Sequence, residues 1–292
     1  MPPACAWARA RSWIIVRDCQ NARVLTARTL LHRDGVTLAD VACTHAAGRG
    51  AEDDRRFSHS LVFVRRGCFV RSVDGDARLL DPTLAYGSNP GQIERIDHPH
   101  DHGDDCTSLR IDPGLAAALW GGDPQLPARP LPTTPRIDLE HRLLLAAADR
   151  GADDHELVER AVGLAAMTLE RDDPARVASG RPATQRARRA LVDDAREALV
   201  ADPDQSLPEL GRRLGASPHH LSRIFRAVTG ATISRHRMRL RVRAALERLA
   251  GGERDLARLA ADTGFADQAH LCRVVREETG TTPSALRGAL AG

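Results

Sequence analysis

The sequence contains no lysine, and all 42 basic residues are arginine. This bias suggests a GC-rich coding genome and excludes no function. The six cysteines are scattered without close pairs, which argues against a disulfide framework and favours a reducing cytoplasm. No apolar run approaches the roughly 18 residues that a membrane-spanning helix needs, so we expect no membrane partner. A phosphate-binding glycine loop, a nucleophile motif and a paired general acid and base are also missing, so we expect neither catalysis nor a cofactor.

The charge is divided unevenly along the chain. Residues 183–292 contain 19 arginines and 13 acidic residues, whereas the rest contains 23 arginines and 26 acidic residues. A basic C-terminal part joined to a mildly acidic N-terminal part is typical of a DNA-binding domain fused to a domain that does not bind DNA. The length of 292 residues is sufficient for two such domains.

The most informative feature is a motif that occurs twice near the C-terminus. Residues 207–226 are LPELGRRLGASPHHLSRIFR, and residues 256–276 are LARLAADTGFADQAHLCRVVR. The matching positions are Leu207 and Leu256, Leu210 and Leu259, Gly215 and Gly264, Leu221 and Leu271, Arg223 and Arg273, Arg226 and Arg276, and Gly230 and Gly280. The second copy has one extra residue in its turn, where a chain tolerates insertion best.

Each copy has the features of a helix–turn–helix unit. Gly215 and Gly264 stand where the first helix must end, often with a positive φ angle. Ser217 followed by Pro218 is a favourable start for the second helix, and Asp267 provides the cap in the other copy. Apolar residues then recur at spacings of three and four, which predicts one buried face per helix.

The opposite faces of these two helices carry side chains that can contact a duplex. They hold arginine, histidine, serine and glutamine, which can bond base edges in the major groove. The alternative is an ordinary solvated helix face, which one copy alone would not exclude. Two copies in matched register, each with arginine at the same place, favour DNA binding.

A long helix is predicted between the two copies, from Ile233 to Ala250, ending at Gly251 and Gly252. A helix of roughly 17 residues spans about 25 Å. Such a rod can hold two recognition helices roughly 34 Å apart, which is about one duplex turn.

Residues from about Arg186 to Arg287 resemble the DNA-binding domain of the AraC/XylS family of bacterial transcription regulators. The resemblance rests on the stretch starting at Ser217, the turn from Gly264 to Gln268, and the closing segment from Gly280 to Arg287. It implies that promoter DNA is contacted at the bases by His219, Ser222, Arg223, Gln268, His270 and Arg273, and at the backbone by His220, Arg226 and Arg276. It also implies a cytoplasmic homodimer, with RNA polymerase and a small-molecule effector as further candidate partners.

Two residues depart from the family pattern. Leu271 and Val275 stand where the family usually has phenylalanine. Smaller apolar side chains are expected to pack less tightly, so the second unit is expected to make the weaker DNA contact. Cys272 occupies the place that corresponds to Ser222.

The N-terminal part is predicted to be a β-barrel of the cupin-like type that resembles the sensor domains of such regulators. Short β-type segments separated by turns at Val73–Asp76 and Asn89–Gly91 support this prediction; they span 36–43, 60–65, 68–73, 77–80 and 107–111. Residues from Leu139 to about Arg171 then predict a helical pair, which either makes a dimer contact or covers the barrel.

The predicted fold is therefore α+β with two domains. Its C-terminal domain is all-α, with two helix–turn–helix units joined by a long helix. The expected boundaries are a disordered leader at 1–27, a cupin-like domain with its helical pair at 28–172, a linker at 173–183 and a DNA-binding domain at 184–292.

Residues 98–106 contain several side chains that can bind a metal ion. His98, His100 and His102 alternate and, with Cys106, form a candidate set of zinc or iron ligands, to which His59 is a candidate distant addition. The favoured interpretation is a solvated loop rim, and a polar lining of an effector pocket is compatible with either. The alternative function is a metal- or thiol-responsive regulator. Cys43, Cys68 and Cys106 are expected to be small buried hydrophobic residues in strands.

Overall fold

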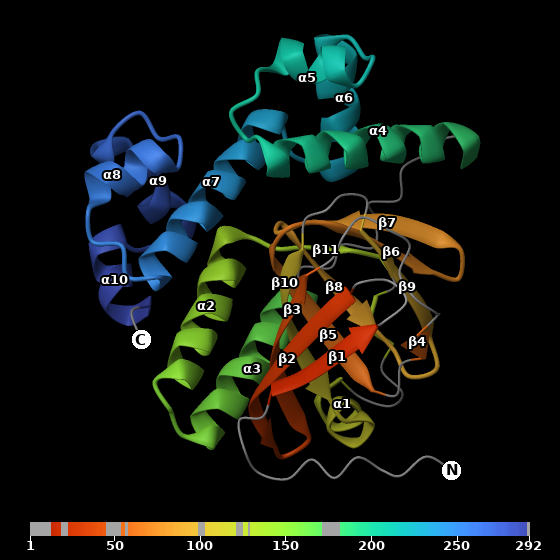
Figure 1. Ribbon diagram of the computed structural model, residues 1–292, viewed down its shortest axis with the longest axis vertical. Helices are drawn as coiled ribbons and strands as arrows, with labels where there is room; N and C mark the ends of the chain where they lie inside the picture. Colours follow the sequence, from red (N-terminus) through yellow and green to blue (C-terminus); the bar gives the residue numbers. More distant parts are fainter. Residues whose placement is uncertain are drawn as a thin grey trace.

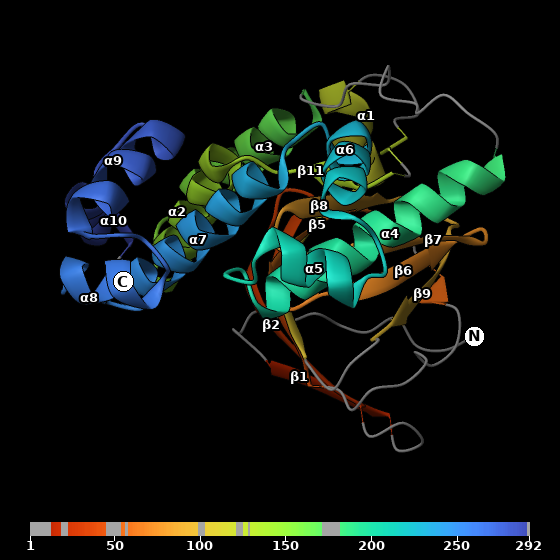
Figure 2. The same ribbon diagram turned by 90° about the horizontal axis from the view of Figure 1, so that it is seen from above.

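The computed structural model describes residues 13–18, 23–44, 54–55, 58–98, 103–120, 125–127, 129–170 and 182–290. A β-rich domain occupies the N-terminal part of the chain, and a helical domain wraps one side of it (Figures 1 and 2). This arrangement confirms the predicted two-domain α+β fold.

Two antiparallel sheets form the N-terminal barrel. The larger sheet has seven strands in the order β1 (Trp13–Asp18), β2 (Arg23–Arg33), β3 (Val36–Thr44), β10 (Asp104–Ile111), β5 (His59–Arg66), β8 (Leu84–Ser88) and β11 (Leu131–Pro132). The smaller sheet has four strands in the order β4 (Asp54–Arg55), β9 (Ile93–Asp97), β6 (Phe69–Val73) and β7 (Asp76–Leu80).

Asp-Gly turns set the register of two hairpins. Asp34 and Gly35 join β2 to β3, and Asp74 and Gly75 join β6 to β7, all four with positive φ. Two successive residues with positive φ are typical of the type I′ turn, whose twist matches that of paired strands. The predicted turn at Val73–Asp76 is confirmed.

The large sheet separates two apolar cores, because successive side chains of a strand point to opposite faces. Leu38, Leu61 and Leu109 point to one face, where helices cover the sheet. Val62 and Cys106 point to the other face, toward Phe69 of the small sheet. This second core is the interior of the barrel.

The remaining elements are helices, apart from short connections. The barrel domain contains α1 (Pro113–Trp120), α2 (Pro135–Asp149) and α3 (Asp154–Leu169). The C-terminal domain contains α4 (Pro182–Ala201), α5 (Leu207–Arg213), α6 (Pro218–Thr229), α7 (Ile233–Ala250), α8 (Leu256–Asp262), α9 (Gln268–Thr279) and α10 (Pro283–Leu290).

Helix α2 is buried on two sides and belongs to both domains. Ile137 and Leu144 pack in the core between the helices and the large sheet. Leu139, on another side of the same helix, packs in the core of the second helix–turn–helix unit. In both ribbon views α2 lies alongside α7 (Figures 1 and 2). The barrel domain and the C-terminal domain therefore share a hydrophobic interface.

Buried polar contacts reinforce this interface. The Arg243 guanidinium on α7 donates hydrogen bonds to the backbone oxygen of Thr133, at 2.9 Å, and to its hydroxyl, at 2.7 Å. Arg142 on α2 pairs with Asp138 on the same helix, at 3.0 Å, and with Glu247 on α7. Both arginines are almost fully buried.

Helix α4 is attached to the barrel by a buried ion pair. Arg196 lies 2.8 Å from Asp81, in the connection between β7 and β8, and Asp81 also accepts two hydrogen bonds from Thr83. Burial alone would raise the pKa of Asp81, but Arg196, His236 and the Thr83 hydrogen bonds hold it below its ordinary value. The carboxylate therefore stays ionised inside the protein. We call Asp81, Thr133, Asp138, Arg142, Arg196, His236 and Arg243 the interface network.

The structure corrects several details of the sequence prediction. Residues 13–18 and 23–27 of the expected disordered leader form strands β1 and the start of β2. Strands β8 and β9 were not predicted, and β10 begins at Asp104 instead of Thr107. In β9 the buried residue is Glu94, which pairs with Arg71 of β6. The strand therefore lacks the alternation of apolar and polar residues by which strands are predicted. Most of the expected linker lies outside the described residues, and α4 begins at Pro182.

Asp81→Ala tests the attachment of α4. The change leaves the Arg196 guanidinium buried without its main partner, which is expected to lower the free energy of unfolding by about 3–5 kcal/mol. Asp76→Ala is the matched control, because Asp76 forms an exposed ion pair with Arg78 and is expected to contribute less than about 1 kcal/mol. Urea unfolding measures both, and equal losses would contradict the structural role of the buried pair.

Candidate nucleic-acid interface

The first helix–turn–helix unit comprises α5 and α6. Helix α5 begins with a capping box in which the Ser206 hydroxyl accepts from the Glu209 amide while the Glu209 carboxylate accepts from the Ser206 amide. The turn contains Gly215 with a φ angle of 64°. Ser217 then caps α6 by accepting from the His220 amide at 3.3 Å. The predicted cap and the predicted left-handed glycine are both confirmed.

The second unit, α8 and α9, repeats this construction. Asp255 caps α8, and Asp267 caps α9 by accepting from the His270 amide at 2.7 Å. Gly264 in the turn has a φ angle of 75°, and Gly280 ends α9 in the left-handed conformation. The two copies of the sequence motif are therefore two copies of one structural unit.

The predicted apolar faces are buried in separate cores. Leu221, Ile224 and Phe225 of α6 pack with α4, and Leu271 and Val275 of α9 pack with α7 and α8. Leu271 and Val275 are fully buried despite replacing larger residues. The weaker DNA contact expected of the second unit stays a prediction.

Helix α7 joins the two units over the predicted range, Ile233–Ala250. Its arginines contact protein groups on both sides. Arg237 donates to the backbone oxygen of Gln205, just before α5. Arg235 pairs with Glu278 of α9 at 2.9 Å, and Arg248 pairs with Asp262 of α8 at 2.9 Å. These arginines therefore fix the two units to the rod.

Arg241 of α7 connects the two units most directly. Its guanidinium pairs with Asp204, in the loop that precedes α5. A Cβ atom built on Gly264, in the turn of the second unit, would lie 2.9 Å from Arg241 Nε and 3.0 Å from Asp204 Oδ1. The turn of the second unit thus packs against the Arg241–Asp204 ion pair, whose aspartate lies next to the first unit.

The arginines of α6 and α9 differ from those of α7. Arg223, Arg226, Arg273 and Arg276 are exposed. Among the residues that the structure describes, none of these four has a carboxylate partner within ion-pair distance. By contrast, Arg235, Arg241 and Arg248 of α7 each pair with a carboxylate. Exposed guanidinium groups without internal partners are available to phosphates and to base edges.

The structure places all the predicted DNA-contacting residues on α6 and α9. His219, His220, Arg223 and Arg226 are exposed on α6, and Ser222 is half-buried there. Gln268, Arg273 and Arg276 are exposed on α9, whereas His270 and Cys272 are half-buried.

Three of these side chains already have neighbours within the protein. The His270 Nδ1 atom accepts from the Ala266 amide at 3.3 Å, and its ring packs edge-on against Phe265. His270 therefore helps to close the turn through its Nδ1 atom. On α6, Arg223 Nη2 lies 3.5 Å from His220 Nδ1.

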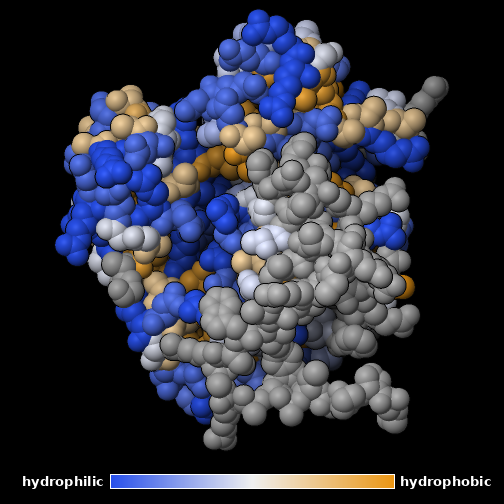
Figure 3. Space-filling view, in the orientation of Figure 1, coloured by the Kyte–Doolittle hydropathy of each residue, from blue (hydrophilic) through white to orange (hydrophobic). Residues whose placement is uncertain are grey.

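The surface around these helices is polar. In the space-filling view, hydrophilic residues cover most of the face over α8 and α9 (Figure 3). Cys272, Arg273, Arg276, Glu277 and Thr282 line a shallow hollow on that unit. Arg273 and Arg276 therefore lie beside a recess that is open to solvent.

The predicted metal-ligand set is only partly brought together. His98 is buried, and its Nε2 atom lies 3.4 Å from Asp104 Oδ1. The three donor groups that approach one another are those of Cys43, His98 and Asp104, so Cys106 is not among them. His100 and His102 lie outside the described residues. The solvated loop rim is therefore wrong for His98.

His59 and the cysteines have other surroundings. His59 is buried with its Nδ1 atom 3.2 Å from Asn89 Oδ1, and it is not part of the His98 group. Cys43 and Cys106 are buried in strands, as predicted, whereas Cys68 is half-buried between β5 and β6. Burial raises the pKa of the Cys68 thiol to about 12, so that thiol stays protonated near neutral pH.

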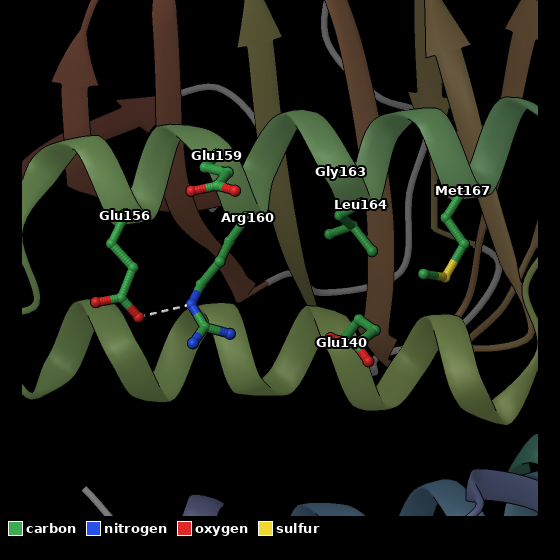
Figure 4. Close-up of a pocket in the computed structure, with 7 residues that line it drawn as sticks. All are labelled: Glu140, Glu156, Glu159, Arg160, Gly163, Leu164 and Met167. Carbon is green, nitrogen blue, oxygen red and sulfur yellow. Dashed lines mark hydrogen bonds and ion pairs between the residues drawn. The ribbon is translucent and has the colours of Figure 1, made fainter.

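A shallow groove runs along the helical pair α2 and α3. Figure 4 shows Glu156, Arg160 and Met167 extending from α3 toward α2, which carries Glu140, whereas Glu159 lies against α3. Glu156 pairs with Arg160 at 2.8 Å. The expected dimer contact through this helical pair stays a prediction. No helix among the described residues is both long and apolar enough to cross a membrane.

Sequence reasoning did not predict the interface network. The arginines of this network lie in amphipathic helices that carry many other arginines. In the sequence they therefore cannot be told apart from arginines that face solvent. The single local signal is the pair Asp138 and Arg142, four residues apart on α2. Nothing in the sequence links either residue to α7.

The family comparison agrees with the two helix–turn–helix units. Residues 210–289 match the family described as helix–turn–helix domain, and a search of curated proteins gives no significant match. ToxT from Vibrio cholerae O395 is 11% identical over 89% of this chain and 100% of its own, with a TM-score of 0.34. A DNA-binding transcriptional dual regulator from Escherichia coli K-12 is 18% identical over 34% of this chain and 89% of its own, with a TM-score of 0.31. A cupin 2 conserved barrel protein from Salinispora arenicola CNS-205 is 14% identical over 35% and 84%, with a TM-score of 0.28. Such TM-scores transfer no function.

Gly264→Ala and Gly215→Ala form a matched pair of tests. Both positions have positive φ, so either alanine is expected to cost about 1 kcal/mol in backbone strain. The space beside Gly215 is open, whereas alanine at Gly264 displaces Arg241 and Asp204. We therefore expect Gly264→Ala to lower the unfolding free energy more, as measured by urea denaturation. Equal effects would show that the Arg241 contact contributes nothing.

His236 predicts a pH dependence of stability. Burial, with nearby Arg196 and Arg243, lowers its pKa to about 4, against the opposing effect of Asp81. The unfolded chain takes up the proton below about pH 6.5 and the folded chain only near pH 4, so stability falls as the pH drops through this window. Between pH 7 and pH 5 the loss is expected to be about 2 kcal/mol. His236→Phe should lack this part of the slope in urea unfolding at the two pH values, and unchanged slopes would contradict the assignment.

Proposed function

The chain carries an AraC-type helix–turn–helix domain at residues 210–289, and we propose that it is a sequence-specific transcription regulator that binds promoter DNA with both units. Helices α6 and α9 are the proposed recognition helices, each in the major groove. The protein then acts in the cytoplasm, where bacterial promoters lie. Its barrel domain modulates DNA binding in response to an effector.

The single observation that carries the proposal is the division of the arginines. The arginines of α7 pair with carboxylates or carbonyl oxygens of the protein. Those at matching positions of α6 and α9 are exposed, and an arginine without an acidic partner attracts the phosphate backbone from a distance. The domain therefore presents two helices, α6 and α9, with exposed arginines at matching positions, and α7 holds both in place.

The residues take two kinds of role in this proposal. Base edges are contacted by His219, Ser222 and Arg223 from α6, and by Gln268, His270 and Arg273 from α9. Arginine is suited to guanine and glutamine to adenine, because each offers a bidentate pair of hydrogen bonds. His220, Arg226 and Arg276 contact phosphates, which position the helices without specifying sequence.

The interface network supports the proposed modulation. The first unit is tied to the barrel through Arg196 and Asp81, and the second unit packs on α2. A ligand that shifts the barrel therefore acts on both recognition helices through protein contacts. RNA polymerase and a second copy of the chain remain proposed partners.

The test begins by selecting a preferred duplex for the purified protein from random DNA. Arg223→Ala is expected to weaken binding to the selected duplex by about 1–3 kcal/mol and to relax preference at one base pair. Arg226→Ala is expected to weaken binding to all sequences alike and to reduce the salt dependence by about one phosphate contact. Affinities at several salt concentrations measure both effects.

Arg160→Ala is the control, because Arg160 is an exposed arginine on α3 of the sensor domain. It should bind both selected and shuffled duplexes as the unchanged protein does. Failure of the unchanged protein to prefer any sequence at moderate salt would overturn the proposed function. Unchanged affinity and base preference for Arg223→Ala would overturn only its assigned role.

A further inference from the structure

Cys43, His98 and Asp104 form a compact group of three different metal-binding side chains. One donor atom from each, the thiol sulfur, an imidazole nitrogen and a carboxylate oxygen, lies within 4.8 Å of the other two. All three residues are buried. They come from strand β3, from the residue just after β9, and from the start of β10.

The strand register brings these side chains to the same place. Cys43 is paired with Asp104 across the β3–β10 ladder, so their side chains lie on one face of the large sheet. The alternation of each strand identifies that face. Cys43 shares it with Val41 and Asp104 shares it with Cys106, and both of these neighbours belong to the barrel interior. His98 follows Ile96, which packs in the same core.

The distance between the His98 imidazole and the Asp104 carboxylate also suits two ligands of one tetrahedral ion. His98 Nε2 and Asp104 Oδ1 are 3.4 Å apart, whereas a charge-assisted hydrogen bond is usually about 2.7–2.9 Å long. Zinc bonds to nitrogen and oxygen of about 2.0–2.2 Å at tetrahedral angles place the two ligand atoms about 3.3–3.5 Å apart. The Cys43 thiol, which shares a hydrogen bond with His98, adds a third donor to this pair.

Close backbone packing holds the group in place. A Cβ atom on Gly103 would lie 2.1 Å from the carbonyl oxygen of Cys43, and one on Gly67 would lie 2.4 Å from the carbonyl oxygen of Gly103. A larger side chain at Gly103 would therefore press on β3, and one at Gly67 would press on the segment that enters β10. The donors are pre-arranged by the backbone before any ion arrives.

We propose that Cys43, His98 and Asp104 bind one divalent ion of the zinc class at one end of the barrel interior. Thiolate, imidazole and carboxylate are all ligands of zinc, and three protein ligands leave a fourth position for water or an exogenous donor. Cys43 and Asp104 belong to the large sheet, whereas His98 extends the small sheet. The ion therefore links the two sheets of the sensor barrel.

Metal titration of the full-length protein tests this proposal without reference to DNA. The protein is freed of metal with a chelator and titrated with Zn²⁺ against a chromophoric competitor, and with Co²⁺ to detect a thiolate-to-cobalt charge-transfer band. We expect one ion per chain, the charge-transfer band, and a rise in melting temperature with Zn²⁺. Absence of stoichiometric binding would overturn the proposal.

Variants distinguish the proposed ligands from their neighbours. Cys43→Ser is expected to lose the charge-transfer band, and Asp104→Asn, which preserves shape, to lose more affinity than the roughly 10–100-fold that removal of an outer partner costs. Cys106→Ala is the matched control, because Cys106 is a buried thiol on the same strand as Asp104 but outside the group. The double variant His100→Ala/His102→Ala is expected to retain both the band and the stoichiometry.

The opposite pattern would overturn the ligand assignment. If Cys106→Ala or the double histidine variant abolished binding while Cys43→Ser retained it, the ion would belong to the other candidate set. Far-ultraviolet circular dichroism of each metal-free variant controls for folding. Because Asp104→Asn removes a charge and no volume, it keeps the test interpretable if Cys43→Ser fails to fold.

Discussion

The structure depends on one helix that contributes side chains to two hydrophobic cores. Helix α2 completes the core beneath the large sheet with Ile137 and Leu144, and it contributes Leu139 to the core of the second DNA-binding unit. A helix that serves two cores must satisfy both packing surfaces at once, so its register and rotation are fixed. The buried pairs of Arg142 and Arg243 add directional contacts to this apolar interface. Burying those guanidinium groups is tolerable because carboxylates or carbonyl oxygens meet them.

Arginine has three distinct uses in this chain, and its surroundings decide which one applies. On α7, arginines next to acidic side chains fasten the two helix–turn–helix units to the rod. At the domain interface, buried arginines join the barrel to the C-terminal domain. On α6 and α9, exposed arginines are left for the proposed DNA contacts. Because the chain has no lysine, the arginine guanidinium serves all three purposes. This group is planar and permanently charged, and it can donate two parallel hydrogen bonds.

The repeat made the C-terminal domain predictable from sequence. Caps such as Ser217 and Asp267, and left-handed glycines such as Gly215 and Gly264, act within a few residues, so local pattern was sufficient. The positions of the proposed DNA-contacting residues follow from the same helical spacing. The barrel was predicted only in outline, because Glu94 is buried by pairing with Arg71 on another strand. The approach of Cys43 to Asp104 depends on the register between β3 and β10, which are about 60 residues apart, and no local pattern encodes it. That Cys43 and Asp104 lie beside His98 could be found only from the folded structure.

The packing of Gly264 against Arg241 and Asp204 has a consequence for the proposed binding of DNA by both units. Because the turn of one unit rests on an ion pair anchored beside the other, the gap between α6 and α9 is set by the protein. Inserting one base pair between two half-sites moves them about 3.4 Å apart and rotates one by about 35° around the duplex axis. A stiff tandem domain cannot follow that rotation without bending the DNA or releasing one half-site. In the proposed mode of DNA binding, tolerance of spacer length therefore depends on this small contact as well as on α6 and α9.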